Sequence, residues 1–166
     1  MRRMTLLAGV IFALGVLVPG SGLAGQGGGD LPLKGSGSGT CTTNLVTGVG
    51  GCLTTDLISH FGLSTVEQDA LTVPTGPDTF IWRATATTTA ANGDQMSFVG
   101  TGTTIATDSS HFLSLGRYTS TGGTGRFAEA TETLDATIHL TVVSVEGAIL
   151  TTLARSTYVG TLSWGS

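Results

Sequence analysis

Residues 118–131, Tyr118-Thr-Ser-Thr-Gly-Gly-Thr-Gly-Arg-Phe-Ala-Glu-Ala-Thr131, place three glycines within four positions, between two runs rich in threonine and apolar residues. Glycine enters the region of positive φ without a steric cost, so Gly122, Gly123 and Gly125 predict a sharp reversal of the chain. Arg126 and Phe127 follow the bend, where an alternating strand directs successive side chains to opposite faces. We therefore predict that this stretch forms the corner of a β-barrel.

The composition of the chain favours an all-β domain. Its 166 residues are the length of one domain, only 11% of them are charged, and 26 are glycine. Threonine and valine suit pleated surfaces and glycine suits tight turns, so many short strands are expected. The formal net charge is −4, which gives no electrostatic attraction for nucleic acid. We expect no nucleic-acid partner.

The first 24 residues have the parts of a secretory signal in the expected order. Arg2 and Arg3 form a cationic start, residues 6–18 carry no charge, and small residues at positions 22 and 24 fit a cleavage site. The alternative is a membrane anchor, but the uncharged run is shorter than the roughly 20 residues that span a bilayer as a helix. We expect a Sec-type signal peptide at residues 1–24 of a protein that is secreted or periplasmic, with no membrane insertion after cleavage.

The rest of the chain divides into a short lead-in and one domain. Residues 25–34 are rich in glycine and predict a flexible lead-in, and residues 35–166 form the expected barrel domain. Cys41 and Cys52 are the only cysteines, and export favours a disulfide between them. Closing a loop of about a dozen residues contributes about 3 kcal/mol. The alternative is a metal site, but two thiols without a nearby histidine do not complete a four-ligand shell. We expect no metal and no cofactor.

Alternating patterns and turn signals predict about eight strands with short connections and no amphipathic helix. The expected strands are residues 33–43, 52–60, 63–73, 79–90, 95–104, 111–119, 132–145 and 148–164. Asn92-Gly93 indicates a hairpin with a type I′ turn. Eight antiparallel strands leave no free edge when they close on themselves, so we predict a single closed eight-stranded antiparallel β-barrel, with a β-sandwich as the alternative.

Residues 79–90 give the clearest strand pattern. Phe80 and Trp82 fall on one face and Arg83 on the other, so either the aromatic rings fill the barrel or Arg83 does. We favour the first arrangement. An eight-stranded barrel encloses enough space for its own side chains or for one small ligand. The candidate ligand-binding residues are therefore Phe80, Trp82, Met96 and Phe98.

Three segments resemble one known group of proteins. GGTGRFA at residues 122–128 resembles the GGTGRFAGATG signature of bacterial exported proteins related to the allene oxide cyclase barrel, which is itself similar to plant dirigent proteins. SHFGLS at residues 59–64 resembles the His-x-Gly strand of that group, and AANGDQ at residues 90–95 resembles its hairpin. The chain departs from the signature at Glu129 and Glu132, which stand where small residues are usual.

The resemblance implies an eight-stranded β-barrel, but it does not carry a function, because most bacterial members of the group have no assigned activity and fold alone does not imply chemistry. The related plant proteins assemble as trimers, which implies a homo-oligomer. The cyclases use a pocket carboxylate, and that residue does not align to any position of this chain. No catalytic residue is transferred.

Candidate chemistry outside the resemblance is sparse. The sequence contains no HExxH, no GxSxG, no CxxC pair and no phosphate loop. Gly123-x-Gly125-x-x-Ala128 formally matches a dinucleotide fingerprint, but no helix is expected after it, so we prefer the structural corner. Arg126 is expected to pair with Glu129 or Glu132 and to brace that corner, in preference to binding an anion.

The catalytic candidates are His60, Glu67 and Arg83. His60 lies beside Gly62 of the second family-like segment, and its ring would act as a general acid or base if it pointed into the barrel with Glu67 or Arg83. His60, His111 and His139 lie on three separate predicted strands. Their convergence on a metal is the alternative to three unrelated histidines, and we favour unrelated histidines.

These observations favour an exported small β-barrel without demonstrable enzymatic activity, which binds an apolar small molecule in its interior or serves as an interaction module. The alternative is a cofactor-free cyclase or isomerase acting on an oxidised lipid or polyketide-like substrate. That activity needs an open pocket of a few hundred Å³ with His60, Glu67 and Arg83 pointing into it. An outer-membrane barrel is disfavoured, because 6% aromatic residues are too few for two girdles.

Overall fold

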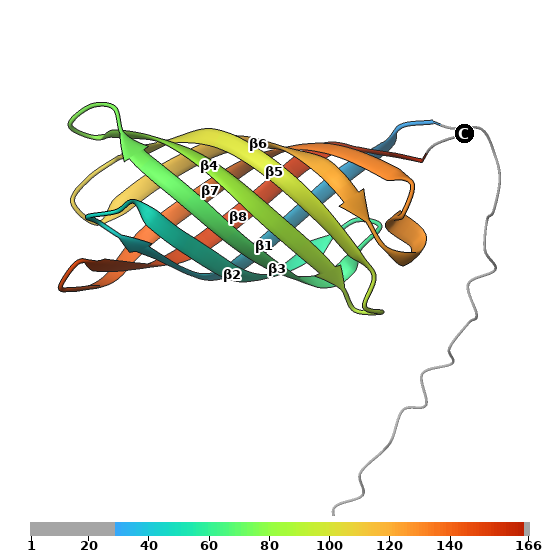
Figure 1. Ribbon diagram of the computed structural model, residues 1–166, viewed down its shortest axis with the longest axis horizontal. Coiled ribbons are helices and arrows are strands. Elements are labelled where there is room, and N and C mark those ends of the chain that lie inside the picture. The colour runs from blue at the N-terminus through green and yellow to red at the C-terminus, as the bar shows by residue number, and fades with distance from the viewer. Residues whose placement is uncertain (1–28, 165–166) are drawn as a thin grey trace, which may run out of the picture.

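The chain forms one closed β-barrel. The computed structural model describes residues 29–164. The strands are β1 (Leu31–Asn44), β2 (Val49–Ile58), β3 (Gly62–Pro74), β4 (Thr79–Ala90), β5 (Gln95–Ala106), β6 (His111–Gly123), β7 (Ala130–Glu146) and β8 (Ile149–Trp164). A short 3-10 helix, η1 (Gly125–Phe127), lies between β6 and β7. Each strand pairs with its neighbours in sequence, and β8 pairs with β1 (Figure 1). The predicted eight-stranded antiparallel barrel is confirmed, and the sandwich alternative is wrong.

One boundary of the sequence-based prediction needs correction. β1 begins at Leu31, which pairs with Leu162 of β8, so the last four residues of the expected lead-in belong to the barrel wall. The predicted signal peptide, residues 1–24, lies outside the described residues. Within them, no helix is long and apolar enough to cross a membrane.

The hairpin at Asn92-Gly93 is confirmed, but its turn is not type I′. A type I′ turn needs positive φ at both Asn92 and Gly93. Gly93 has a φ of 87°, but Asn92 does not have a positive φ, since His60 is the one non-glycine residue of the described chain that does. The Gly93 amide donates to the Ala90 carbonyl at 2.9 Å, and the Asp94 amide donates to Oδ1 of Asn92 at 3.2 Å. This is a type I turn followed by a left-handed glycine, which suits the longer loop between β4 and β5.

The strands are strongly staggered around the barrel. A path through laterally paired residues starts at Phe80 of β4 and returns to the same strand ten positions along, at Ala90, by way of Thr104, Ser114, Ile138, Ser156, Gly37, Asp56 and Ser64. For eight strands, a stagger of this size corresponds to a tilt of about 40° from the barrel axis. Residues on this path and at every second position from it face the interior.

Large rings inside the barrel lie over glycines of neighbouring strands. A Cβ atom at Gly102 or Gly116 would overlap the indole of Trp82, and one at Gly100 would overlap the ring of Tyr118. The ring centroids of Trp82 and Tyr118 are 5.5 Å apart. The aromatic residues of β4 therefore face inward, as predicted, and Arg83 is exposed on the outer wall.

The predicted corner closes one end of the barrel, at the right in Figure 1. Gly122 and Gly125 have φ values of 153° and 55°, and Gly125 begins η1. Phe127 is fully buried and stacks on Phe61, with ring centroids 4.3 Å apart. Leu33, Ile58, Met96 and Leu162 belong to the same hydrophobic core as these two rings.

The expected partner of Arg126 is wrong. Its Nε lies 3.7 Å from Oδ2 of Asp94, and its guanidinium lies 4.7 Å from the centroid of the Phe127 ring. η1 brings Arg126 over the β4–β5 hairpin that carries Asp94, while Glu129 is exposed and Glu132 points into the barrel. Arg126 does brace the corner, but through a carboxylate that is distant in sequence.

The fit between rings and glycines gives the first prediction. Gly116→Ala should lower the free energy of unfolding by about 1–3 kcal/mol, because the added methyl group overlaps the Trp82 ring in a closed barrel that has little room to shift. Gly76→Ala is the matched control, since a Cβ there meets nothing closer than 3.8 Å. Urea unfolding of both variants measures the effect, and equal stabilities would contradict this account of the interior.

Candidate functional site

The end of the barrel opposite η1 contains a cavity of about 160 Å³. Its lining residues belong to the end of the barrel where the β1–β2, β3–β4, β5–β6 and β7–β8 connections gather, which is the left end in Figure 1, and we call it the mouth cavity. Its apolar lining includes Phe80, Trp82, Phe112, Ile138, Leu140 and Leu150. Its polar lining includes Gln68, Thr104, Ser114 and Thr152. An apolar cavity with a few polar groups is the usual form of a small-molecule site.

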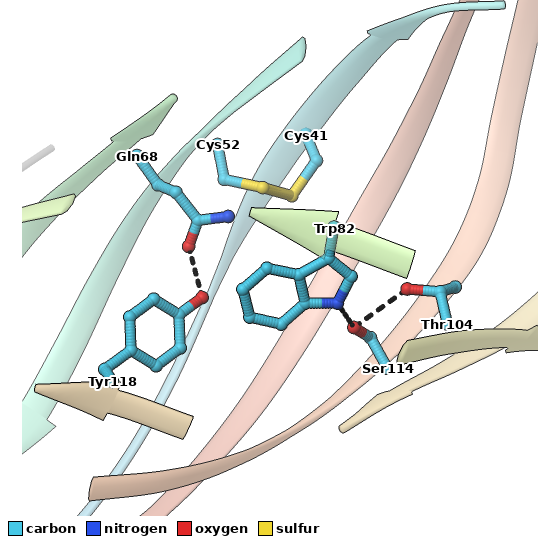
Figure 2. The surroundings of a disulfide bond; sticks show 7 residues. All are labelled: Cys41, Cys52, Gln68, Trp82, Thr104, Ser114 and Tyr118. Atoms are coloured by element: carbon cyan, nitrogen blue, oxygen red, sulfur yellow. Dashed lines mark hydrogen bonds between the residues drawn. A yellow bond between two sulfur atoms is a disulfide. The ribbon is translucent and has the colours of Figure 1, made fainter. Parts of the chain in front are cut away.

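Hydrogen bonds fix the indole of Trp82 in the lining of the cavity. Its Nε1–H donates to Oγ of Ser114 at 2.9 Å, and the Thr104 hydroxyl donates to the same oxygen at 2.9 Å (Figure 2). Thr104 and Ser114 are paired across β5 and β6, so the sheet register itself places both hydroxyls beside the ring. The indole therefore presents a fixed aromatic face to the cavity.

A third hydrogen bond crosses the barrel deeper in the interior. The Tyr118 hydroxyl donates to Oε1 of Gln68 at 2.6 Å (Figure 2). Gln68 lines the mouth cavity and also a void of about 30 Å³ that Tyr118, Phe98 and Tyr158 share. Burial raises the pKa of Tyr118, so its hydroxyl keeps its proton and remains a donor at neutral pH. The Gln68–Tyr118 pair thus separates the mouth cavity from the deeper void.

The predicted disulfide between Cys41 and Cys52 is present and forms part of the cavity wall. The two residues are directly opposite each other on β1 and β2 (Figure 2). The predicted disulfide is therefore confirmed, and the alternative metal site at these two cysteines is wrong.

Two acidic side chains are buried inside the barrel, and sequence reasoning did not identify them as site residues. Asp56 has no exposed surface, and Glu132 is 3% exposed. Within the described chain, the Asp56 carboxylate makes no close hydrogen bond, but the Tyr158 and Thr54 side chains lie next to it and act on its pKa as hydrogen-bond donors. Oε2 of Glu132 has no hydrogen-bond partner among the described residues. Burial raises the pKa of Asp56, and it raises the pKa of Glu132 to about 8. The signal in the sequence was strand parity: Asp56 is two positions from Ile58, and Glu132 is two from Leu134, both of which are buried.

The three catalytic candidates do not meet inside the barrel. His60, Glu67 and Arg83 are all exposed on the outside. Glu67 and Arg83 take the outward positions of β3 and β4, since Gln68 and Trp82 take the inward ones. His60 lies in the turn after β2, with its Nε2 3.2 Å from the Pro32 carbonyl oxygen. The requirement that they share an interior pocket is not met.

The candidate ligand-binding residues and the other histidines also lie in different parts of the barrel. Phe80 and Trp82 line the mouth cavity, Phe98 lines the deeper void, and Met96 is fully buried in the closed end. His111 pairs with Asp108 at 2.9 Å, and His139 is exposed on β7. Across residues 29–164, no group of three or more His, Cys, Asp or Glu side chains is arranged to hold a metal ion.

Comparison with known proteins gives a likeness of fold. No family model matches the chain, and no curated protein matches its sequence. Among solved structures, that of the pterocarpan synthase dirigent protein GePTS1 is similar, with 11% sequence identity, a TM-score of 0.45, and coverage of 87% of this chain and 90% of that one. At this level of identity, the likeness does not bear on the chemistry of the interior.

The buried position of Glu132 predicts a pH dependence of stability. Its folded-state pKa of about 8 lies above the ordinary 4.5, so the folded protein retains a proton that the unfolded chain loses. The free energy of unfolding should therefore fall as the pH rises from 4.5 to 8. Asp56 contributes with the same sign, because burial also raises its pKa.

Glu132→Gln should remove the Glu132 part of this loss. Urea unfolding at pH 9 should show the variant more stable than the wild type by roughly 3–5 kcal/mol, with little difference at pH 4. Glu129→Gln, at an exposed position three residues away, should follow the wild type at both pH values. An equal pH slope in Glu132→Gln and the wild type would show that Glu132 is not buried as a neutral acid.

Proposed function

We propose that this protein is an exported β-barrel that binds one small, largely apolar molecule in its mouth cavity. The observation that carries the proposal is the cavity of about 160 Å³ at one end of a barrel whose other end is closed by packed apolar side chains. Apolar cavities of about this volume hold a single aromatic ring. The ligand class is therefore a molecule with one ring or an alkyl group of similar bulk.

Export is the second part of the proposal. The Cys41–Cys52 disulfide favours an oxidising compartment such as the periplasm or the extracellular space. The cationic start and the uncharged run of residues 1–24 support the same location. The homo-oligomer implied by the resemblance to trimeric plant proteins stays a prediction.

Binding without catalysis is preferred to the cyclase or isomerase hypothesis. That hypothesis required a pocket of a few hundred Å³ and three inward side chains. The mouth cavity is smaller, and His60, Glu67 and Arg83 are exposed on the outer surface. No specific observation among the described residues favours turnover of an oxidised lipid.

A substitution that fills the cavity tests ligand binding. Ala70 lines the cavity and its neighbour Leu71 is exposed on the outer wall, so Ala70→Phe and Leu71→Phe form a matched pair. The wild type and Leu71→Phe should bind 2-phenylethanol in calorimetric or NMR titrations. Ala70→Phe should lose about tenfold or more in affinity, because the new ring occupies the ligand volume. Equal binding by both variants, or none by the wild type, would refute the proposal.

Mass spectrometry of protein purified from its own host tests export. The mature chain should begin near residue 25 and should be two hydrogens lighter than the dithiol form. A chain that retains residues 1–24, or one with two free thiols, would contradict the assignment to an oxidising compartment. Under native conditions, the same sample should also retain any bound ligand as an added mass.

A further inference from the structure

The lining of the mouth cavity carries no charge. Among the described residues that form it, none is Lys, Arg, His, Asp or Glu, and apolar side chains predominate. A charged ligand would lose its hydration there without meeting an opposite charge, so the cavity favours neutral molecules. Which neutral molecules it selects then depends on the few polar groups of the lining.

Gln68 places a hydrogen-bond donor at the inner end of the cavity. Its Oε1 accepts the hydrogen bond from the Tyr118 hydroxyl, which fixes the orientation of the amide. Figure 2 shows the amide nitrogen directed away from Tyr118, toward the Cys41–Cys52 bond. Cys52 is opposite Gln68 across β2 and β3, and both residues line the cavity. Within residues 29–164, Nε2 of Gln68 has no hydrogen-bond partner, so its N–H groups are available to a ligand.

A second donor comes from the hydrogen-bonded group of Trp82, Thr104 and Ser114. One indole N–H and two hydroxyls give this group three donor hydrogens. Two of them are used in the bonds to Oγ of Ser114, and neither hydroxyl has another partner within the described chain. The remaining hydrogen is that of Ser114, and reversal of the bond between the hydroxyls would only transfer it to Thr104. Both hydroxyls line the cavity, so a free O–H faces the ligand in either case.

At both places the acceptor atom is already occupied and a hydrogen is free. Oε1 of Gln68 holds the Tyr118 hydrogen, and Oγ of Ser114 accepts two hydrogen bonds. Threonine hydroxyls elsewhere in the lining, such as that of Thr152, donate or accept equally well, so they do not bias the choice. A ligand without an acceptor would leave the free hydrogens buried and unpaired, which costs free energy.

We infer that the mouth cavity selects a neutral one-ring molecule that carries a hydrogen-bond acceptor, and that Gln68 donates to that acceptor. The class includes small aromatic ketones, aldehydes and esters. This inference rests on the proposed function and narrows its ligand class. With the acceptor at Gln68, the ring of the ligand lies toward the mouth, where the rings of Phe80, Trp82 and Phe112 line the wall.

Two ligands of the same shape test the inference: acetophenone, which has a C=O group, and 2-phenylpropene, which has C=CH2 in its place. The hydrocarbon leaves water more readily than the ketone. The informative quantity is therefore the ratio of the two dissociation constants, measured by NMR titration at pH 7 and compared between variants.

Gln68→Met and Glu67→Met, each combined with Tyr118→Phe, form the matched pair of variants. Tyr118→Phe removes the hydroxyl that Gln68→Met would leave without a partner, and Glu67 is the exposed neighbour of Gln68 on the outer wall. Relative to 2-phenylpropene, acetophenone should bind about fivefold or more weakly to the Gln68→Met protein than to the Glu67→Met protein, because only the first lacks the amide donor.

The infrared carbonyl stretch of bound acetophenone reports the hydrogen bond directly. A donor to the carbonyl oxygen weakens the C=O bond, so the band of the ketone bound to the wild type should lie at lower wavenumber than that of the ketone dissolved in hexane. The Gln68→Met variant should shift the band back toward the value in hexane, and the Glu67→Met variant should not.

The outcomes separate this inference from the proposed function. If both ligands bind but the ratio is the same in the two variants, Gln68 does not donate and the inference is wrong, while the binding proposal stands. If the wild type binds neither ligand, the inference is wrong, and the titration with 2-phenylethanol decides the binding proposal separately. Should the Gln68→Met variant fail to fold, the wild-type spectrum decides, since a carbonyl band at the value in hexane would overturn the inference.

Discussion

The pairing of β8 with β1 is the contact on which the rest of the structure depends. It joins the last strand to the first, from Leu31 opposite Leu162 to Asn44 opposite Ile149, and leaves every strand with two neighbours. Closure satisfies backbone groups that a sheet edge would expose. β1 contributes mainly backbone to this role, because its inward positions include Gly35, Gly37 and Gly39. The missing side chains leave the space that the Asp56 carboxylate occupies.

Closure also fixes the volume of the interior, and the sizes of the inward side chains determine how that volume is filled. The rings of Trp82 and Tyr118 lie against glycines of β5 and β6, so large inward residues face small ones on other strands. At one end, Phe127 and Phe61 complete the packing, and at the other a cavity remains. The asymmetry arises because η1 folds an aromatic residue over one end, whereas the connection that reaches the mouth cavity contributes Leu45.

Sorting of charge gives the interior its chemical character. The basic residues of the described chain are exposed on the outside, whereas Asp56 and Glu132 are buried in the interior. Two acids buried in the interior make it an unfavourable environment for a carboxylate ligand such as an ionised fatty acid. This argues against an oxidised-lipid substrate on electrostatic grounds, independently of the exposed positions of His60, Glu67 and Arg83.

The sequence by itself determined the strands, their alternation, the glycine corner and the disulfide, because each depends on local periodicity, turn chemistry or a single available pairing. Residues 79–90 matched β4, and Phe80 and Trp82 were correctly placed inside. The tertiary structure decided which side chains from different strands meet. Asp94 replaced Glu129 and Glu132 as the partner of Arg126, and the Asp56 side chain of β2 came to lie over Gly37 of β1, because the closed sheet brings together residues that no local pattern relates. The alternation along one strand can show that Asp56 points inward. Only the closed barrel shows that every cationic side chain of the described residues lies on the outside.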